Sequence, residues 1–197
     1  MSDVHVYYTS DSLFRGPFGI DIKNPEHFSV ENSQLSADSS GETGLLTSVT
    51  SKEDNVKHQI QLSFVMYGVK MAKDKSRAYL VLTDGEVQSV AIFKPFIRVL
   101  RGPLMSEFKV MLSNVEHVVR LQNSPGTDGS SVEIHNIVDI KSQQNKELAM
   151  KVDTDVSNQD REFFTDLNGF QVHRHCTLDK LPLQANYYHA YNGIPGR

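Results

Sequence analysis

The sequence lacks most of the features that mark disulfide scaffolds, membrane proteins and nucleic-acid-binding proteins. Its 197 residues contain one cysteine, Cys176, so an internal disulfide framework is excluded. No run of about 20 apolar residues is present, and residues 1–8 carry neither the charged nor the apolar region of a signal peptide. The formal net charge of −4 is small and the basic residues are spread out, which excludes a concentrated nucleic-acid-binding face. No Asn-x-Ser/Thr acceptor for N-glycosylation occurs. We therefore expect a soluble chain with no membrane segment, no export signal and no nucleic-acid partner.

The helical pattern is also missing, because no segment carries apolar side chains at a spacing of 3.6 residues. Apolar and polar side chains instead alternate in residues 58–67, 131–140 and 148–152, with Asn136 as an exception on an apolar face. Further strands are expected over residues 87–100, 107–112 and 115–121. Turn signals rich in Gly, Pro and Asp occur at residues 83–85, 101–103 and 124–129. Many short alternating strands separated by turns predict an all-β fold, an antiparallel β-sandwich.

The most distinctive stretch is REFFTDLNGFQVHRHCTLDKLPLQANYY, residues 161–188. Its aromatic pair, Phe163 and Phe164, runs into a turn signal built from Asp166, Asn168 and Gly169. A basic strand follows, and then Pro182, which lacks a backbone donor and suits an edge strand or a loop. Alternation alone does not require this order of residue types, so we interpret the stretch as a fixed, partly buried corner of a larger structure.

This stretch resembles the middle part of the class II α-mannosidases, the family 38 glycoside hydrolases, and especially their Golgi mannosidase II branch. The family pattern is F-[FY]-T-D-L-N-G-[FY]-Q, a basic stretch, and L-x-K-L-P-L-Q-[AG]-N-x-Y-P. Three further stretches resemble the same branch in the same order: ETGLLTSV (residues 42–49), DKSRAYLVLTDG (residues 74–85) and SVEIHNIVDI (residues 131–140). The resemblance implies a portion of a galactose-mutarotase-like supersandwich, truncated at its C-terminal side, that packs against a catalytic domain.

The resemblance also suggests how the chain is divided. Residues 1–27 match the family poorly, and we expect them to form a loosely ordered lead-in. Residues 28–188 are expected to form the β-sandwich. Residues 189–197 depart from the family pattern and read as an unrelated tail.

The activity that the resemblance implies is the retaining hydrolysis of α-linked mannose on N-glycans in the Golgi. In the family, the catalytic aspartates and a zinc ion held by His and Asp side chains belong to an N-terminal barrel. No part of that barrel is recognisable here, so we expect no catalytic residue and no metal ligand in this chain. The segment would support the barrel, line its sugar pocket, and be inactive alone.

Tyr79 is the one substrate-binding residue that the resemblance implies. The equivalent tyrosine of the family reaches from the β-region toward the sugar in the barrel. A tyrosine suits this role because its ring covers an apolar sugar face while its hydroxyl makes a hydrogen bond. The alternative is an ordinary strand aromatic. Arg77 stands where the family has glycine, which adds a long cation where the backbone needs freedom and weighs against a competent site.

Other chemistry-bearing residues have plainer interpretations. His173 and His175 would share one face of a strand, but a zinc site needs more ligands, and a solvated basic strand is favoured. No local motif activates Cys176, which we expect to be an inert, half-buried thiol. Residues 153–160 lack the glycine and glutamate of a calcium loop and read as a polar turn. Glu162 and Asp166 could form a carboxylate pair, but a role for Asp166 in capping the following turn is favoured.

Two alternatives to a mannosidase segment stay open. One is a non-catalytic β-sandwich module that binds carbohydrate or protein through an exposed surface. The other is a fragment that does not persist as a folded protein.

Overall fold

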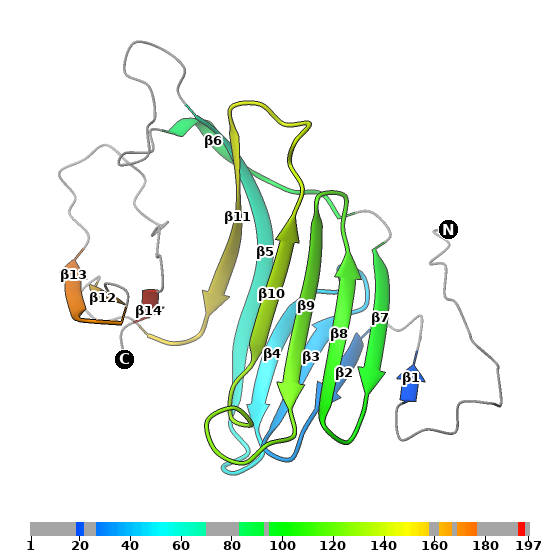
Figure 1. The fold of residues 1–197 in the computed structure, drawn as a ribbon. Helices are drawn as coiled ribbons and strands as arrows, with labels where there is room; N and C mark the ends of the chain where they lie inside the picture. Colours follow the sequence, from blue (N-terminus) through cyan, green and yellow to red (C-terminus); the bar gives the residue numbers. More distant parts are fainter. Residues whose placement is uncertain are drawn as a thin grey trace. The chain divides into compact units, whose positions relative to one another are not determined.

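The computed structural model describes residues 19–21, 27–69, 83–92, 95–157, 162–166, 169–176 and 193–195. Regular structure in these ranges consists of strands joined in antiparallel pairs, which confirms the predicted all-β class (Figure 1). None of the described residues forms a helix that could cross a membrane. The chain divides into two compact units, residues 1–154 and 155–197.

The first sheet of residues 1–154 has the strand order β1-β7-β8-β9-β10. Its strands are β1 (Gly19–Asp21), β7 (Phe96–Arg101), β8 (Met105–Met111), β9 (Val115–Gln122) and β10 (Glu133–Val138). The predicted turn signal at residues 101–103 begins at the last residue of β7 and leads into β8, and the one at residues 124–129 lies between β9 and β10. Strands β7 to β10 therefore form a meander of sequence neighbours.

The second sheet has the order β11-β5-β4-β3-β2, and β6 also pairs with β5. Its strands are β2 (His27–Glu31), β3 (Leu35–Ser40), β4 (Leu46–Ser51), β5 (Lys57–Val69), β6 (Thr83–Ser89) and β11 (Lys146–Thr154). The long strand β5 organises this sheet, because it pairs with β4 near its start, with β6 near its end and with β11 along most of its length.

The structure corrects the prediction of one strand over residues 87–100. This segment contains two strands of different sheets, since β6 pairs with β5 and β7 pairs with β1 and β8. Pro95 lies just before β7, and its missing N–H prevents an uninterrupted ladder. Residues 83–85 were predicted as a turn but belong to β6. The positive φ of Gly85, 79°, falls where the β5–β6 register shifts.

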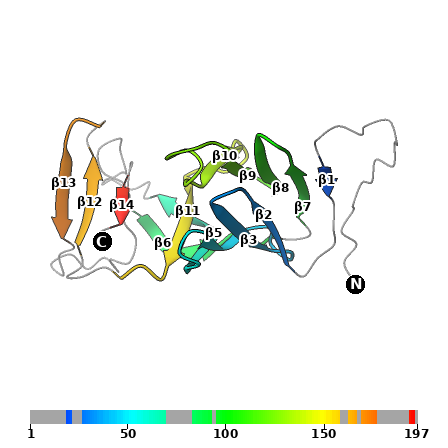
Figure 2. The ribbon, with the colours of Figure 1, turned by 90° about the horizontal axis from the view of Figure 1, so that it is seen from below.

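The two sheets pack face to face and form the predicted sandwich, which Figure 2 shows as two layers. Its core joins alternate residues of β8 and β9 to those of β2, β3, β4 and β5. Phe108 is fully buried and meets Phe28 of the other sheet edge to face, with ring centroids 5.2 Å apart. Gly44 lets the β3–β4 turn approach this core closely. It has φ of 73°, and a Cβ there would lie 2.8 Å from both methyl carbons of Val110.

The side-chain amide of Asn32 connects two loops at one end of the sandwich, and both its oxygen and its nitrogen form hydrogen bonds. Its oxygen accepts hydrogen bonds from the backbone N–H groups of Gln34 (2.8 Å) and Leu35 (2.6 Å) in the β2–β3 turn. Its Nδ2 donates to the carbonyl oxygens of Gln122 (2.7 Å), the last residue of β9, and Gly129 (2.8 Å), within the loop that follows. Because the residue is only 5% exposed, these four bonds offset the cost of burying its amide.

His117 explains the exception that Asn136 makes on the apolar face of β10. The two residues are register partners, and His117 Nδ1 donates to Asn136 Oδ1 at 2.7 Å. The imidazole is fully buried between the sheets, with Phe64 of β5 edge to face at 5.7 Å. Asn136 Nδ2 in turn lies 3.3 Å from Met150 Sδ of β11. The buried imidazole thus has an exposed amide as its partner, and the contact of that amide with Met150 joins the two sheets.

The second unit, residues 155–197, contains a three-stranded sheet in the order β13-β12-β14. Its strands are β12 (Glu162–Asp166), β13 (Val172–Cys176) and β14 (Gly193–Pro195). The predicted limits of the sandwich at residues 28 and 188, and the tail at residues 189–197, stay predictions.

The burial of His117 predicts that the protein loses stability in mild acid. Burial lowers the pKa of the imidazole below its ordinary 6.5, and the hydrogen bond to Asn136 opposes this only in part. The unfolded chain therefore binds a proton more readily than the folded one between the lowered pKa and 6.5. The contribution of neutral His117 to the free energy of unfolding is fully present above pH 6.5. It decreases as the pH falls below 6.5, by at most about 1.4 kcal/mol per pH unit.

This prediction is tested by urea unfolding between about pH 5 and pH 8. His117→Gln should remove part of the decrease in unfolding free energy toward low pH. The control is His135→Gln, because His135 is exposed on the outer face of β10. A difference between the wild type and His117→Gln that stays constant across the range would contradict the prediction.

Candidate functional site

Tyr79 and Arg77 lie outside the described residues. The substrate-binding role of Tyr79 therefore stays a prediction from the resemblance. The candidates that the structure does place lie on the hairpin of β12 and β13, at the end of β11, and on the outer face of the first sheet.

The hairpin of β12 and β13 confirms the predicted role of Asp166. Its carboxylate accepts a hydrogen bond from the backbone N–H of Gly169 at 2.8 Å, and Gly169 has the positive φ, 75°, that such a turn requires. Glu162, the other member of the possible carboxylate pair, forms an ion pair with Arg174 on the neighbouring strand. The two carboxylates thus have separate structural partners, which favours capping and pairing over acid–base chemistry.

His173 and His175 share one face of β13, as predicted, and their ring centroids lie 6.3 Å apart. His175 is held by two contacts: it stacks on Phe163 at 5.0 Å, and its Nε2 lies 2.9 Å from Thr165 Oγ1. Every residue of β13 is exposed, which agrees with a solvated basic strand. No group of three or more His, Cys, Asp or Glu side chains that could hold a metal ion occurs among the residues that the structure describes.

Cys176 departs from its prediction, because its thiol is exposed and not half-buried. The reason is that β13 has no covered face. Residues 153–160, predicted as a polar turn, differ from that prediction in part. Asp153 and Thr154 are the last residues of strand β11, and Asp153 forms an ion pair with Lys151 at 2.8 Å. Asn158 and Asp160, its other candidate ligands, lie outside the described residues.

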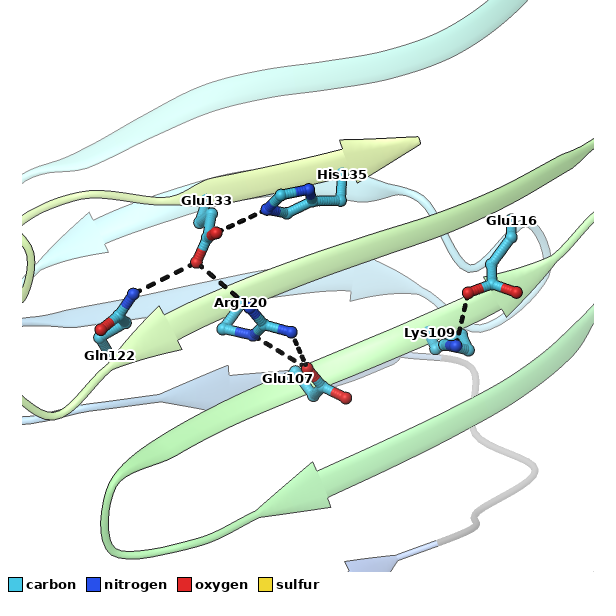
Figure 3. Close-up of polar contacts among 7 residues, drawn as sticks. All are labelled: Glu107, Lys109, Glu116, Arg120, Gln122, Glu133 and His135. Atoms are coloured by element: carbon cyan, nitrogen blue, oxygen red, sulfur yellow. Dashed lines mark hydrogen bonds and ion pairs between the residues drawn. The ribbon is translucent and has the colours of Figure 1, made fainter. Parts of the chain in front are cut away.

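The outer face of the first sheet carries a network of charged side chains that the sequence pattern did not predict (Figure 3). Arg120 lies at its centre and donates from Nε (3.0 Å) and Nη2 (2.9 Å) to Glu107 Oε2 on β8. Its Nη1 lies 3.5 Å from Glu133 Oε2 on β10, and Glu133 Oε1 lies 2.5 Å from His135 Nε2. A separate ion pair joins Lys109 Nζ to Glu116 Oε1 at 2.5 Å.

These contacts limit what the outer face can do chemically. The hydrogen bond from His135, with further contributions from Gln122 and Arg120, lowers the pKa of Glu133 and keeps it ionised at neutral pH. An ionised carboxylate cannot serve as a general acid. Glu107 and Glu116 likewise face cations. The spacing of two residues between Glu107 and Lys109, and between Glu133 and His135, is visible in the sequence and places each pair on one face of its strand. Their network depends on register partners across β8, β9 and β10, which single strands do not reveal.

Comparison with known proteins gives one consistent result. The model of the glycosyl hydrolases family 38 C-terminal domain matches residues 30–188. The chain is 45% identical over 148 residues to Alpha-mannosidase 2 of Homo sapiens, a match that covers 75% of this chain and 13% of that protein. It is 38% identical over 191 residues to Alpha-mannosidase 2 of Rattus norvegicus, covering 95% of this chain and 16% of the relative. Alpha-mannosidase 2 of Drosophila melanogaster is 34% identical over 200 residues, a match that covers 96% of this chain and 17% of that protein.

The chain therefore spans about one sixth or less of the length of these relatives. The four motifs on which the resemblance was based all overlap the matched range, which confirms the predicted family. The chain belongs to the glycosyl hydrolases of family 38, and residues 30–188 correspond to their C-terminal domain.

Proposed function

We propose that this chain acts as a scaffold segment of an α-mannosidase that removes α-linked mannose from N-glycans. The observation that carries the proposal is the family match over residues 30–188, together with identities of 34 to 45% to proteins named Alpha-mannosidase 2. The segment's part is to support the catalytic barrel and to place Tyr79 at the rim of its sugar pocket. The compartment that goes with this role is the Golgi.

The ion pairs of the described residues support a scaffold role over a catalytic one. Glycoside hydrolysis with retention needs two carboxyl groups about 5 Å apart, one of them with a raised pKa. Glu107, Glu133 and Glu162 each contact an arginine, and the pKa of Glu133 is lowered. These side chains stabilise strand pairs and are poorly suited to donating a proton.

Zinc belongs to the proposed activity only through the barrel of the family. The residues described here do not fit such an ion, since they offer no cluster of three or more His, Cys, Asp or Glu side chains. We therefore derive no step of the reaction through a metal bound to this chain.

The purified chain is expected to show no turnover of an aryl α-mannoside, with or without added zinc. The physical reason is that the reacting carboxylates belong to the barrel. A complete class II α-mannosidase, assayed in parallel, provides the positive control. Zinc-dependent turnover that copurifies with the chain would contradict the proposed scaffold role.

A binding module is the second candidate function, and the exposed aromatic ring of Phe170 favours it, because exposed aromatic side chains are typical of recognition surfaces. Calorimetric titration with methyl α-mannoside separates the two functions. We expect no heat of binding from the scaffold segment alone. Measurable heat that Tyr79→Phe reduces would instead indicate a carbohydrate-binding module.

A further inference from the structure

The loop between β9 and β10 contains a dipeptide, Asp128–Gly129, whose two residues differ in exposure. Asp128 is exposed, whereas Gly129 is buried. A Cβ on residue 129 would lie 2.0 Å from the carbonyl oxygen of Ser124 and 2.7 Å from Nε2 of Gln34. Only glycine fits this position, so the packing of the loop requires that the aspartate is followed by a residue without a side chain.

An aspartate followed by glycine can react with its own backbone. The amide nitrogen of Gly129, which no side chain hinders, attacks Cγ of the protonated Asp128 carboxyl group. The new N–Cγ bond closes a five-membered succinimide ring, and the amide proton and the carboxyl hydroxyl leave together as water. A water molecule then opens the ring: attack at Cγ restores aspartate, and attack at the backbone carbonyl carbon gives isoaspartate. The overall change is an isomerisation, which needs no oxidant and no cofactor.

The fold restrains this ring closure. The N–H of Ser130 donates to the carbonyl oxygen of Gly126 at 3.2 Å, so residues 127–129 lie within a single helix-like turn. In a helical backbone the nitrogen of the following residue points away from the aspartate carboxyl carbon, and closure requires the peptide plane before Gly129 to rotate. That rotation moves Gly129, whose carbonyl oxygen accepts a hydrogen bond from Asn32 Nδ2 at 2.8 Å.

We propose that Asp128–Gly129 is a site of isoaspartate formation, and that Asn32 controls its rate by holding Gly129. Isoaspartate adds one carbon to the main chain between residues 128 and 129, so Gly129 loses its close fit against Ser124 and its hydrogen bond to Asn32. The modification thereby loosens the connection between the β2–β3 turn and the loop after β9. It requires no sugar, metal or second chain and is independent of the proposed function.

The chain offers an internal comparison in β6. Asp84–Gly85 is also an aspartate followed by glycine, and a Cβ on Gly85 would have nothing within 4 Å. Isomerisation there displaces no packed group and does not involve Asn32. The rate at Asp84 therefore reports general unfolding, against which the rate at Asp128 is measured.

The first test compares the wild-type chain, Asn32→Ala and Asn123→Ala during incubation in neutral buffer at physiological temperature. Isoaspartate at residue 128 is measured by peptide mapping with electron-transfer fragmentation. It should form about 5 to 30 times faster in Asn32→Ala, because losing the hydrogen bonds of this buried amide makes local opening more frequent. Asn123→Ala is the matched control, since Asn123 Nδ2 donates to the carbonyl oxygen of Gly102 at 3.2 Å and should leave the rate unchanged.

Three results would overturn the proposal. Equal rates at Asp128 in the wild type and Asn32→Ala would remove the control by Asn32. The same acceleration at Asp84 as at Asp128 would show general unfolding and not the release of this loop. No isoaspartate at residue 128 after incubation in urea would show that the dipeptide is not reactive.

A second measurement does not depend on the folding of Asn32→Ala. Wild-type chain that has been incubated to partial modification is subjected to pulse proteolysis at increasing urea concentration. Molecules with isoaspartate at residue 128 should be cleaved at lower urea than unmodified molecules, and those modified at Asp84 should not. Asp128→Glu, which cannot close a five-membered ring, should keep its midpoint during incubation. Equal midpoints for unmodified molecules and those modified at residue 128 would overturn the structural consequence.

Discussion

The apolar contact between two inner sheet faces is the interaction on which the rest of the sandwich depends. Phe108, Val119 and Leu121 of one sheet are fully buried against residues such as Val30 and Leu46 of the other. Each strand places every second side chain in this core, so the alternate side chains are free to carry charge. The network of Arg120, Glu107 and Glu133 is a consequence of that alternation, and it covers the outer surface without contributing to the core.

Two buried polar groups give this contact its register. Asn32 uses its whole amide to join the β2–β3 turn to the loop after β9. His117 and Asn136 pair directly across β9 and β10. A slip of one residue between β9 and β10 would separate this pair and leave the buried imidazole of His117 without its partner, at a cost of about 1–3 kcal/mol. We interpret these polar insertions as features that favour one arrangement of otherwise similar apolar strands.

The sequence predicts local features of this fold well and pairings between distant strands poorly. The alternation in residues 58–67 and the Asp166 turn were predicted correctly because both depend on neighbours in the chain. The strand break at Pro95 was missed, because the sheet that β6 or β7 joins depends on distant partners. The role of Asn136 was visible only as an exception until β9 placed His117 opposite it. The exposure of Cys176 was missed for a similar reason, since an alternating pattern does not show whether anything covers a strand.

The central claim is that the stability of the chain resides in the two-sheet core of residues 1–154, since β12 and β13 contain no buried residue. Hydrogen exchange of the 197-residue chain, followed strand by strand, tests it most directly. The account predicts the slowest amide exchange in β8 and β9, and exchange near the rate of unstructured peptide in β12 and β13. Protection of β12 and β13 equal to that of β8 and β9 would contradict it.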